Sequence, residues 1–460
     1  MNYSEAVAQL SALMPELHTA PGGERRKFTL AEIGLLCAAL DDPQRRFPSV
    51  LIAGTNGKGS TAATLGSMAQ AAGLRVGLYT SPHLERVNER VRLSRDGRLA
   101  EIDDATFARH FCRVQDVAQR LVLDGTLRGM PSYFELMTAL AFCVFAEARV
   151  DLAVLEVGMG GRLDATNIVD PRVSIITDIS LDHQEWLGET IGAIAREKAG
   201  ILREGGVMVT LPQHPEANTA LGEVAVRLNV RGVNAAAYMP TRGTEDASGY
   251  SLTVMGREIA VDSPLHGAHQ QRNVALAIAA AVELATEHGF PITAAAMEAG
   301  IRATDWPGRL ETIRREGWPE VIVDVAHNPA GAWALRAAVH AVNEASPRGP
   351  QVLVFGCLRD KPVRELGQIL FPLFDRVVLV PVNSPRATAM DAMQAAAAAT
   401  GVATEAAESV EQALAAARAA ASAAPSAAAS HDGRGDGRIV VSGSVYLVGE
   451  ARHWLRTAPR

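Results

Sequence analysis

Cysteine is scarce in this 460-residue chain, and its four copies lie far apart. They are Cys37, Cys112, Cys143 and Cys357, and no two of them form a CxxC pair. Closely spaced cysteines are typical of structural zinc sites and of small disulfide-bonded domains, so their absence argues against both. We expect four free thiols.

Long apolar runs and an excess of basic charge are also missing. The longest apolar run, Leu136 to Ala146, lies between two glutamates and falls well short of the roughly 20 residues that cross a bilayer, so we expect a buried helix there. The N-terminus carries Glu5 and no basic stretch of the secretory type. A formal net charge of -7 supplies no basic field for nucleic acid or anionic lipid. We expect a cytoplasmic monomer with neither as a partner.

Aromatic residues make up only 5% of the chain, but 48% of it is hydrophobic, as in ordinary globular proteins. Short apolar runs alternate with amphipathic helical stretches, which predicts an α/β fold with mostly parallel sheets. We expect strands at 49–53, 76–79, 152–157, 173–177, 321–325, 352–355, 376–380 and 439–441.

The length favours two domains. Trp306, Pro307 and Gly308 interrupt the helical pattern of residues 275–288 and 294–302, which places a boundary nearby. We therefore expect domains at 1–303 and 304–460, the second with its own strands and a helix over 330–344. The Ala-rich stretch 413–438 predicts a helix that runs into a surface loop.

The strongest local signal is the segment from Ser49 to Thr61, SVLIAGTNGKGST, in which an apolar strand leads through a Gly-rich turn into a helix. In such a turn the backbone N–H groups point together at phosphate oxygens, and a lysine, here Lys58, reaches the outer phosphates. The spacing departs from GxxxxGK[ST], but the strand and helix supply the required context. The predicted nucleotide-binding residues here are Asn56, Gly57, Lys58, Gly59 and Ser60. No NKxD guanine-reading motif occurs, so ATP is favoured over GTP.

Two further polar residues are expected at strand ends. Glu156 ends one predicted strand, and His183 is expected to follow a strand within 178–183. The carboxyl ends of parallel strands meet at one edge of a sheet, so both side chains are candidates for binding one cation. A helix-capping glutamate and a structural histidine are the alternatives.

Several separated motifs occur in one order: GTNGKGS, TSPHL, EVGMGGRLDATN, DISLDHQEWLG, REKAGI, HQQRN, WPGRLE and DVAHNP. In this order they resemble the Mur ligase superfamily, specifically its folylpolyglutamate synthase and dihydrofolate synthase branch. The resemblance implies a P-loop-type N-terminal domain followed by a smaller Rossmann-like domain. It also implies ATP-dependent ligation of L-glutamate to dihydropteroate and to tetrahydrofolate polyglutamates, through an acyl phosphate.

The resemblance also implies roles for individual residues. Ser81, Glu156 and His183 are expected to bind Mg2+, and Lys198 to be carbamylated. Asn273, Arg309 and Asp324 are expected to contact ATP, and His327 to assist the reaction together with Lys58 and Lys198. The pterin-containing substrate is expected at Ser132, Tyr133, Phe134, Glu135, Leu163, Asp164 and Ala165, with Asp164 accepting two hydrogen bonds from an aminopyrimidinone edge. Plain core packing of Phe134 is the alternative.

Three other functions are open to this sequence. The chain is either bifunctional, as stated, or a folylpolyglutamate synthase alone. A cell-wall Mur ligase carries a substrate domain before the phosphate loop, for which the residues preceding Gly54 are too few. An ATP-binding regulatory protein without ligase activity would need no set of catalytic residues.

Overall fold

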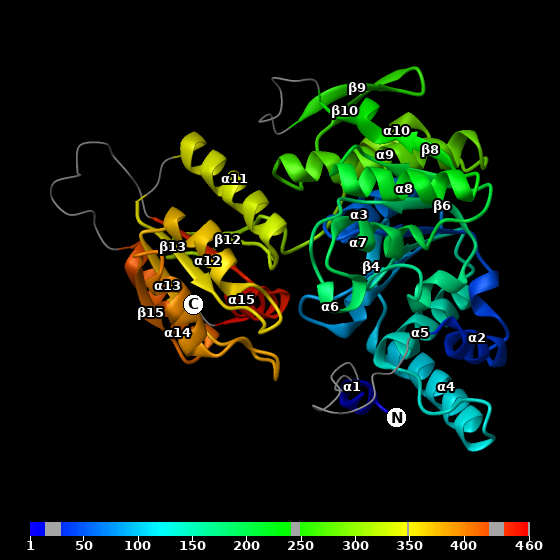
Figure 1. The fold of residues 1–460 in the computed structure, drawn as a ribbon, viewed down its shortest axis with the longest axis horizontal. Coiled ribbons are helices and arrows are strands. Elements are labelled where there is room, and N and C mark those ends of the chain that lie inside the picture. Colours follow the sequence, from blue (N-terminus) through cyan, green and yellow to red (C-terminus); the bar gives the residue numbers. More distant parts are fainter. Residues whose placement is uncertain (14–28, 241–248, 347–348, 423–436, 459–460) are drawn as a thin grey trace. The chain divides into compact units, whose positions relative to one another are not determined.

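A computed structural model describes residues 1–13, 29–240, 249–346, 349–422 and 437–458 (Figure 1). The chain forms two compact units. Unit 1 comprises Met1–Pro264 and Gln271–Asp305, and unit 2 comprises Leu265–Gln270 and Trp306–Arg460. The division thus falls after Asp305, two residues beyond the boundary that we expected between residues 303 and 304. In addition, Leu265–Gln270 belongs to unit 2.

Unit 1 is built on an eight-stranded sheet in the order β4-β3-β2-β5-β1-β6-β7-β8. β2, β5, β1, β6, β7 and β8 run parallel, and β3 and β4 are antiparallel additions at one edge. A separate hairpin pairs β9 with β10. The strands are β1 Ser49–Ala53, β2 Val76–Tyr79, β3 Val91–Arg95, β4 Arg98–Glu101, β5 Leu152–Glu156, β6 Pro171–Ile176, β7 Val207–Thr210, β8 Arg231–Asn234, β9 Tyr250–Val254 and β10 Arg257–Val261.

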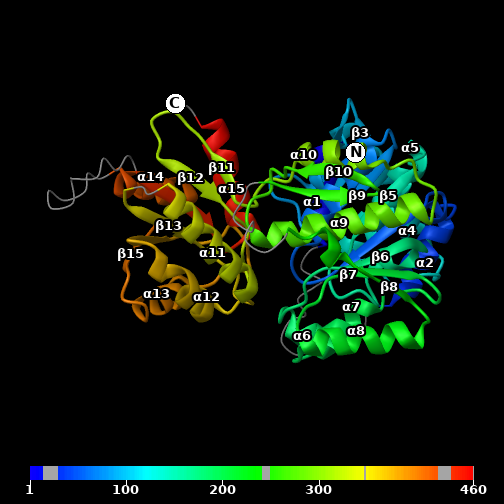
Figure 2. The same ribbon diagram turned by 90° about the horizontal axis from the view of Figure 1, so that it is seen from above.

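Helices cover both faces of this sheet. Successive strand residues point to opposite faces, and here both sets are apolar, so each face needs a cover. Leu51 and Ala53 of β1 pack into one core with α1, α2, α4, α5, α7 and α8, whereas Val50 and Ile52 pack into another with α3, α9 and α10 (Figures 1 and 2). The helices are α1 Tyr3–Ala12, α2 Leu30–Ala39, α3 Lys58–Ala71, α4 Asp104–Leu123, α5 Tyr133–Ala148, α6 Gln184–Leu187, α7 Ile191–Ala199, α8 Pro215–Arg227, α9 Ala268–Thr286 and α10 Ala294–Arg302. Short 3-10 helices lie at Pro43–Arg45, Val87–Arg90, Ala165–Ile168 and Ala235–Tyr238.

Unit 2 has a six-stranded sheet in the order β11-β12-β16-β13-β14-β15, parallel except for β11. Its strands are β11 Glu311–Ile313, β12 Glu320–Val323, β13 Gln351–Phe355, β14 Arg376–Leu379, β15 Ala403–Ala406 and β16 Arg438–Ser442. Its helices are α11 Pro329–Ala345, α12 Val363–Leu370, α13 Met390–Ala398, α14 Val410–Ala421 and α15 Val445–Thr457, with a 3-10 helix at Phe371–Leu373. Leu353 and Phe355 of β13 pack against α11, α12 and α13 in one buried core.

The predicted α/β fold is confirmed, and each of the eight strands whose ranges were predicted lies within one or two residues of an observed strand. One expectation was wrong: residues 178–183 form a loop after β6, because Asp178 and Ser180 bond to the phosphate loop and not to a neighbouring strand. The sequence patterns also missed the weakly apolar edge strands, among them β4, β8 and β15.

The remaining structural expectations concern helices and thiols. The run after Glu135 is buried in α5, and all four cysteines are free. No helix among the described residues is long and apolar enough to cross a membrane. The predicted helix near 413 is α14, and the loop expected after it lies mostly outside the described residues.

Candidate functional site

Strand order brings four polar loops to one edge of the unit 1 sheet. β2, β5, β1 and β6 are consecutive neighbours and run parallel, so their carboxyl ends lie in a row. Ser81 follows β2, Glu156 ends β5, the Gly54–Gly57 loop follows β1, and the 177–183 loop follows β6. Ligands of open α/β sheets bind at such carboxyl ends.

The phosphate loop needs glycine at two positions. Gly57 has a φ of 88° at the N-cap of α3, a conformation that residues with a side chain rarely adopt. A Cβ atom at Gly57 would lie 2.1 Å from Oδ1 of Asn273, and one at Gly54 would lie 1.8 Å from Oγ1 of Thr177. The loop is therefore packed tightly on both sides, and Asn273 of α9 lies directly against it.

The loop after β6 supports the phosphate loop by hydrogen bonds. The backbone N–H groups of Thr55 and Asn56 donate to the Asp178 carbonyl oxygen over 2.9 and 3.2 Å. The Thr55 hydroxyl donates to the Ser180 carbonyl, and the Ser180 N–H donates to that hydroxyl, each over 3.1 Å. These bonds hold the turn between β1 and α3 in one conformation.

Lys58, Glu156 and Ser81 lie together beside this loop. Nζ of Lys58 donates to the Thr55 carbonyl oxygen over 3.2 Å and lies 4.0 Å from Oε1 of Glu156. The other oxygen of Glu156 accepts a hydrogen bond of 3.0 Å from the Ser81 N–H. Both charged side chains are largely buried, at 15% and 5% exposure. A cation and a carboxylate thus lie close together beside the phosphate loop.

The expected magnesium ligands are Ser81, Glu156 and His183. Among the described residues no group of three or more His, Cys, Asp or Glu side chains is arranged as a metal site. Magnesium does not require one, since it commonly binds one or two carboxylates together with substrate phosphates and water. The buried Glu156 carboxylate beside a phosphate loop suits that mode. His183 has a left-handed backbone at the start of α6, and its side chain is 39% exposed.

Lys198 is buried at the same edge, although it lies on α7. Its side chain is only 4% exposed, and Nζ donates a hydrogen bond of 2.6 Å to the Gly54 carbonyl oxygen. Burial, followed by the positive charge of Lys58, lowers the pKa of Lys198 to about 7. A substantial fraction of this amine is therefore neutral near neutral pH, and a neutral amine can react as a nucleophile.

Two of the residues expected at the acid substrate form a helix cap. The hydroxyl and the backbone N–H of Ser132 donate to Oε2 of Glu135 over 2.7 and 2.8 Å, and the Glu135 N–H donates back to the hydroxyl. This reciprocal arrangement is the capping box of α5. A capping role therefore accounts for both side chains without a ligand.

Asp164 is also engaged within its own loop. Oδ2 accepts hydrogen bonds from the N–H groups of Gly158 and Met159, and Oδ1 accepts from the N–H and hydroxyl of Thr166. A carboxylate has about four acceptor positions, so these four bonds use them. Asp164 is thus held within its own loop, and its expected contact with a pterin edge stays a prediction. Burial raises the pKa of Asp164, against the effect of these bonds.

The other residues of the predicted substrate site differ in exposure. Leu163 is 37% exposed, whereas Ala165 is buried. The ring of Phe134 packs 6.0 Å from the ring of Tyr79 and against Gly158, where a Cβ atom would lie 2.6 Å from the Phe134 ring. Tyr133 is buried beside the Arg90 guanidinium, which lies 5.2 Å from its ring centroid.

In unit 2, Asp324 organises the turn that carries Arg309. Asp324 follows β12, and its two oxygens accept hydrogen bonds of 2.9 Å from the N–H groups of Leu310 and Ala326. The side chain is buried, and burial raises its pKa against the opposing charges of His269 and Arg309. Asp324 thus joins the 308–310 turn to the end of β12.

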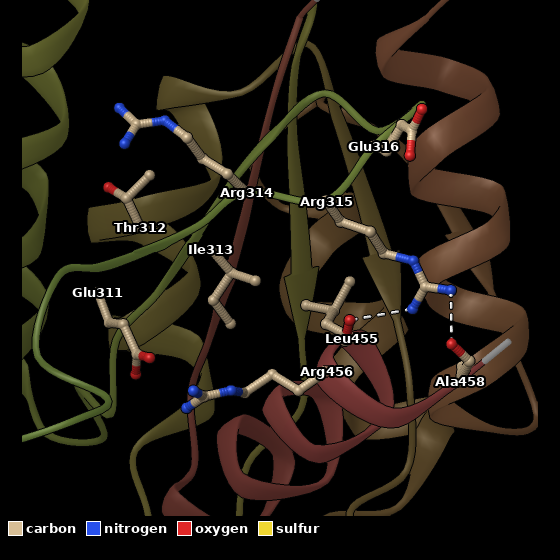
Figure 3. A pocket seen from close by; sticks show the side chains of 9 residues that line it. All are labelled: Glu311, Thr312, Ile313, Arg314, Arg315, Glu316, Leu455, Arg456 and Ala458. Atoms are coloured by element: carbon tan, nitrogen blue, oxygen red, sulfur yellow. Dashed lines mark hydrogen bonds between the residues drawn. The ribbon is translucent and has the colours of Figure 1, made fainter. Parts of the chain in front are cut away.

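His327 and Asn328 follow Asp324. Nδ1 of His327 lies 2.8 Å from the Val325 carbonyl oxygen, and the Asn328 side chain caps α11 through the Gly331 N–H. A separate cavity of unit 2, about 500 Å³ in volume, is lined by residues 311–316 and the end of α15 (Figure 3). Arg315 caps that helix through the carbonyl oxygens of Leu455 and Ala458, and none of the predicted site residues lines the cavity.

Sequence reasoning missed two features of unit 1. His83 accepts a hydrogen bond of 2.9 Å from Nε of Arg90, and burial, with the Arg90 charge, lowers the pKa of His83 to about 3, so this imidazole is neutral. Asp178 forms an ion pair with Arg272 of α9. The TSPHL motif contains His83, but nothing in local spacing pairs it with Arg90 or joins Asp178 to Arg272.

Comparisons with known proteins agree with this architecture. Residues 119–281 match the Mur ligase middle domain, and residues 308–443 match the Mur ligase, glutamate ligase domain. A folylpolyglutamate synthase of Lacticaseibacillus casei is 36% identical over 84% of this chain and 87% of its own length. A dihydrofolate synthase/folylpolyglutamate synthase of Mycobacterium tuberculosis is 36% identical over 80% of this chain and 77% of its own.

Solved structures agree over the whole length. The folylpolyglutamate synthase of Mycobacterium tuberculosis, complexed with ADP and AMPPCP, has a TM-score of 0.82 at 33% identity and full coverage of both chains. FolC of Escherichia coli, in complex with DHPP and ADP, has a TM-score of 0.75 at 30% identity, with 97% of each chain covered.

Together with the phosphate loop and the second α/β unit, the two matched domains identify an ATP-dependent ligase of the Mur type. The chain belongs to the dihydrofolate synthase/folylpolyglutamate synthase family.

Proposed function

We propose that this chain joins L-glutamate to dihydropteroate, forming dihydrofolate, and adds further glutamates to tetrahydrofolate, in each case with cleavage of ATP to ADP and inorganic phosphate. The observation that carries the proposal is the arrangement of Lys58, Glu156 and Ser81 around the phosphate loop. Relatives that match this chain over most of its length are named for both activities.

The reaction begins with the substrate carboxylate. One of its oxygens attacks the γ-phosphorus of ATP, which forms an acyl phosphate and releases ADP. The amine of glutamate then attacks the acyl carbon and loses a proton, which gives a tetrahedral intermediate. This intermediate collapses to the amide and inorganic phosphate. Phosphorylation is needed because a carboxylate has no adequate leaving group.

The contribution of this chain is charge stabilisation and positioning. Nζ of Lys58 and the backbone N–H groups at the start of α3 are proposed to stabilise the negative charge that develops on the transferred phosphoryl group. Asn273 is proposed to contact ATP, in keeping with its position against Gly57. In unit 2, Arg309, Asp324 and His327 are proposed to act on the nucleotide or the amino acid.

Magnesium is proposed at Ser81, Glu156 and His183, where it would neutralise phosphate charge. The contact between the Ser81 N–H and the Glu156 carboxylate orients that carboxylate at the end of β5. Lys58, 4.0 Å away, would share the phosphate charge from the other side.

Lys198 is proposed to carry a carbamate. Its neutral Nζ would attack carbon dioxide and lose a proton, which gives a buried anionic carbamate that can orient substrate or a second magnesium ion. Burial and the neighbouring Lys58 charge support this, because both favour the neutral amine.

An ADP-release assay with glutamate and either dihydropteroate or tetrahydrofolate tests the proposal, with products identified by mass. Turnover with both acids, and a product heavier by one glutamyl group, is expected. Turnover with tetrahydrofolate alone would leave a folylpolyglutamate synthase. Nucleotide binding without turnover on either acid would indicate an ATP-binding regulatory protein.

A further inference from the structure

Arg272 forms an ion pair that none of the reaction steps above uses. It lies on α9 next to Asn273, and its guanidinium binds both oxygens of Asp178, with Nε at 2.8 Å and Nη2 at 2.5 Å. Nη2 also donates to the Pro212 carbonyl oxygen over 3.2 Å. Three bonds therefore hold one guanidinium between the loop after β6 and the loop after β7.

Asp178 is the residue on which the start of the phosphate loop depends. Its carbonyl oxygen accepts the N–H groups of Thr55 and Asn56, while its carboxylate is held by Arg272. The next residue is held as well, since the Ile179 N–H donates to Oε1 of Gln213 over 2.7 Å. A rotation of the Asp178 peptide would move both loop amides away from their present direction.

α9 thus supports the phosphate loop through two adjacent residues, one directly and one through Asp178. Asn273 packs directly against Gly57 at the end of the loop, and Arg272 acts through Asp178 at its beginning. One contact thus supports the start of the loop and the other its end.

The geometry of the pair decides how much it can contribute. Its side chains are 29% and 39% exposed, and ordinary ion pairs at such exposure contribute little. A bidentate arginine–carboxylate pair is an exception, because two parallel hydrogen bonds fix orientation as well as distance. The additional bond to Pro212 restricts the guanidinium further.

We propose that Arg272 is a positioning residue for ATP: it clamps Asp178, whose carbonyl oxygen accepts the Thr55 and Asn56 N–H groups, and so holds the start of the phosphate loop in the conformation that binds ATP. This inference rests on the proposed function only in taking the loop as the ATP site. Arg272 itself touches neither nucleotide nor substrate in this proposal.

The test measures binding of AMPPCP with magnesium, steady-state KM values and amide hydrogen exchange in the nucleotide-free protein. Arg272→Met is expected to weaken AMPPCP binding about tenfold, the equivalent of one hydrogen bond to a charged group. KM for ATP should rise in parallel, KM for glutamate should stay within about twofold, and the Thr55 and Asn56 amides should exchange faster. Asp178→Asn should behave similarly, and Arg272→Lys should fall between.

Arg75 supplies a matched control in the same unit. It binds both oxygens of Asp151 through Nε at 3.1 Å and Nη2 at 2.6 Å and has no bond to the phosphate loop. Arg75→Met should leave AMPPCP binding and exchange at Thr55 and Asn56 unchanged. An equal loss of binding in Arg75→Met would reduce the effect to general destabilisation and overturn the proposal.

Unchanged nucleotide binding and unchanged exchange at Thr55 and Asn56 in Arg272→Met would also overturn it. If Arg272→Met does not fold, Arg272→Lys and Asp178→Asn decide the matter by the same measurements. Failure of the wild-type protein to bind AMPPCP would contradict the proposed function, whereas normal wild-type binding that Arg272→Met leaves unchanged, together with unchanged exchange, would contradict only the positioning role.

Discussion

The two α/β units use their strand ends differently. In unit 1, charged side chains that follow different strands or lie on different helices meet around the phosphate loop: Lys58, Glu156 and Lys198 each contact the loop or one another. In unit 2, the Asp324 carboxylate is occupied by two backbone N–H groups of its own unit and supports the turn that presents Arg309. The arrangement in unit 1 is suited to binding a charged ligand, and the arrangement in unit 2 to positioning the Arg309 side chain.

We expect the largest effect at Lys58, whose charge is central to the charge-binding role of unit 1. Lys58→Ala should lower kcat/KM about a thousandfold, because the transferred phosphoryl group loses its lysine partner while the loop amides remain. Steady-state ADP release measures this, and circular dichroism checks that the variant is folded. Near-normal turnover would remove the charge-binding role assigned to unit 1.

Lys198 provides the next test. Lys198→Ala should lower kcat about a hundredfold if the modified lysine orients substrate. In buffer freed of carbon dioxide, bicarbonate should restore wild-type activity but not that of the variant. Full activity of Lys198→Ala in ADP release would contradict a catalytic role for this residue.

The pKa of Lys198 predicts the pH dependence of that response. The pKa of the buried amine is lowered to about 7, so its neutral fraction rises as pH increases through that value. Activation by bicarbonate should therefore increase from about pH 6 to about pH 8. Activity measured at fixed bicarbonate tests this, and an activation that decreases over the range would contradict it.

Asp324 tests the positioning role of unit 2. Asp324→Asn keeps one acceptor but presents an amide N–H₂ to the other backbone N–H, which should cost about 1–3 kcal/mol of unfolding free energy. The loss should be smaller at higher pH, because the raised pKa of Asp324 means that folding binds a proton and wild-type stability falls as pH rises through that pKa. Urea unfolding at two pH values measures both effects. Equal stability of the two proteins would contradict the structural role.

The smallest effect is expected at the α5 cap. Ser132→Ala should lower the unfolding free energy by about 1 kcal/mol, as loss of an N-cap hydroxyl does. If capping is its whole role, KM for dihydropteroate should remain unchanged. A large rise in that KM without loss of stability would instead support the substrate role predicted from sequence.

Sequence patterns predicted those features whose residues are close together in the chain. Strand β1, the Gly-rich turn and α3 are contiguous, so the segment from Ser49 to Thr61 predicted both the structure and its ligand class. The strand expected within 178–183 failed because that segment's hydrogen bonds go to Thr55 and Asn56, more than 120 positions away in the chain. The full occupation of Asp164 by its own loop was equally invisible in the motif.

The fold class, the phosphate loop and the residue types available for binding ATP follow from the order of amino acids alone, since periodicity and glycine spacing act over a few residues. The tertiary structure alone decided which of those residues meet. The order β2-β5-β1-β6 brings Ser81, Glu156 and Lys58 together, burial beside Lys58 lowers the pKa of Lys198, and α9 places Arg272 against Asp178. Such contacts depend on which strands are neighbours and how deeply each charge is buried, and the spacing of residues along the chain predicts neither.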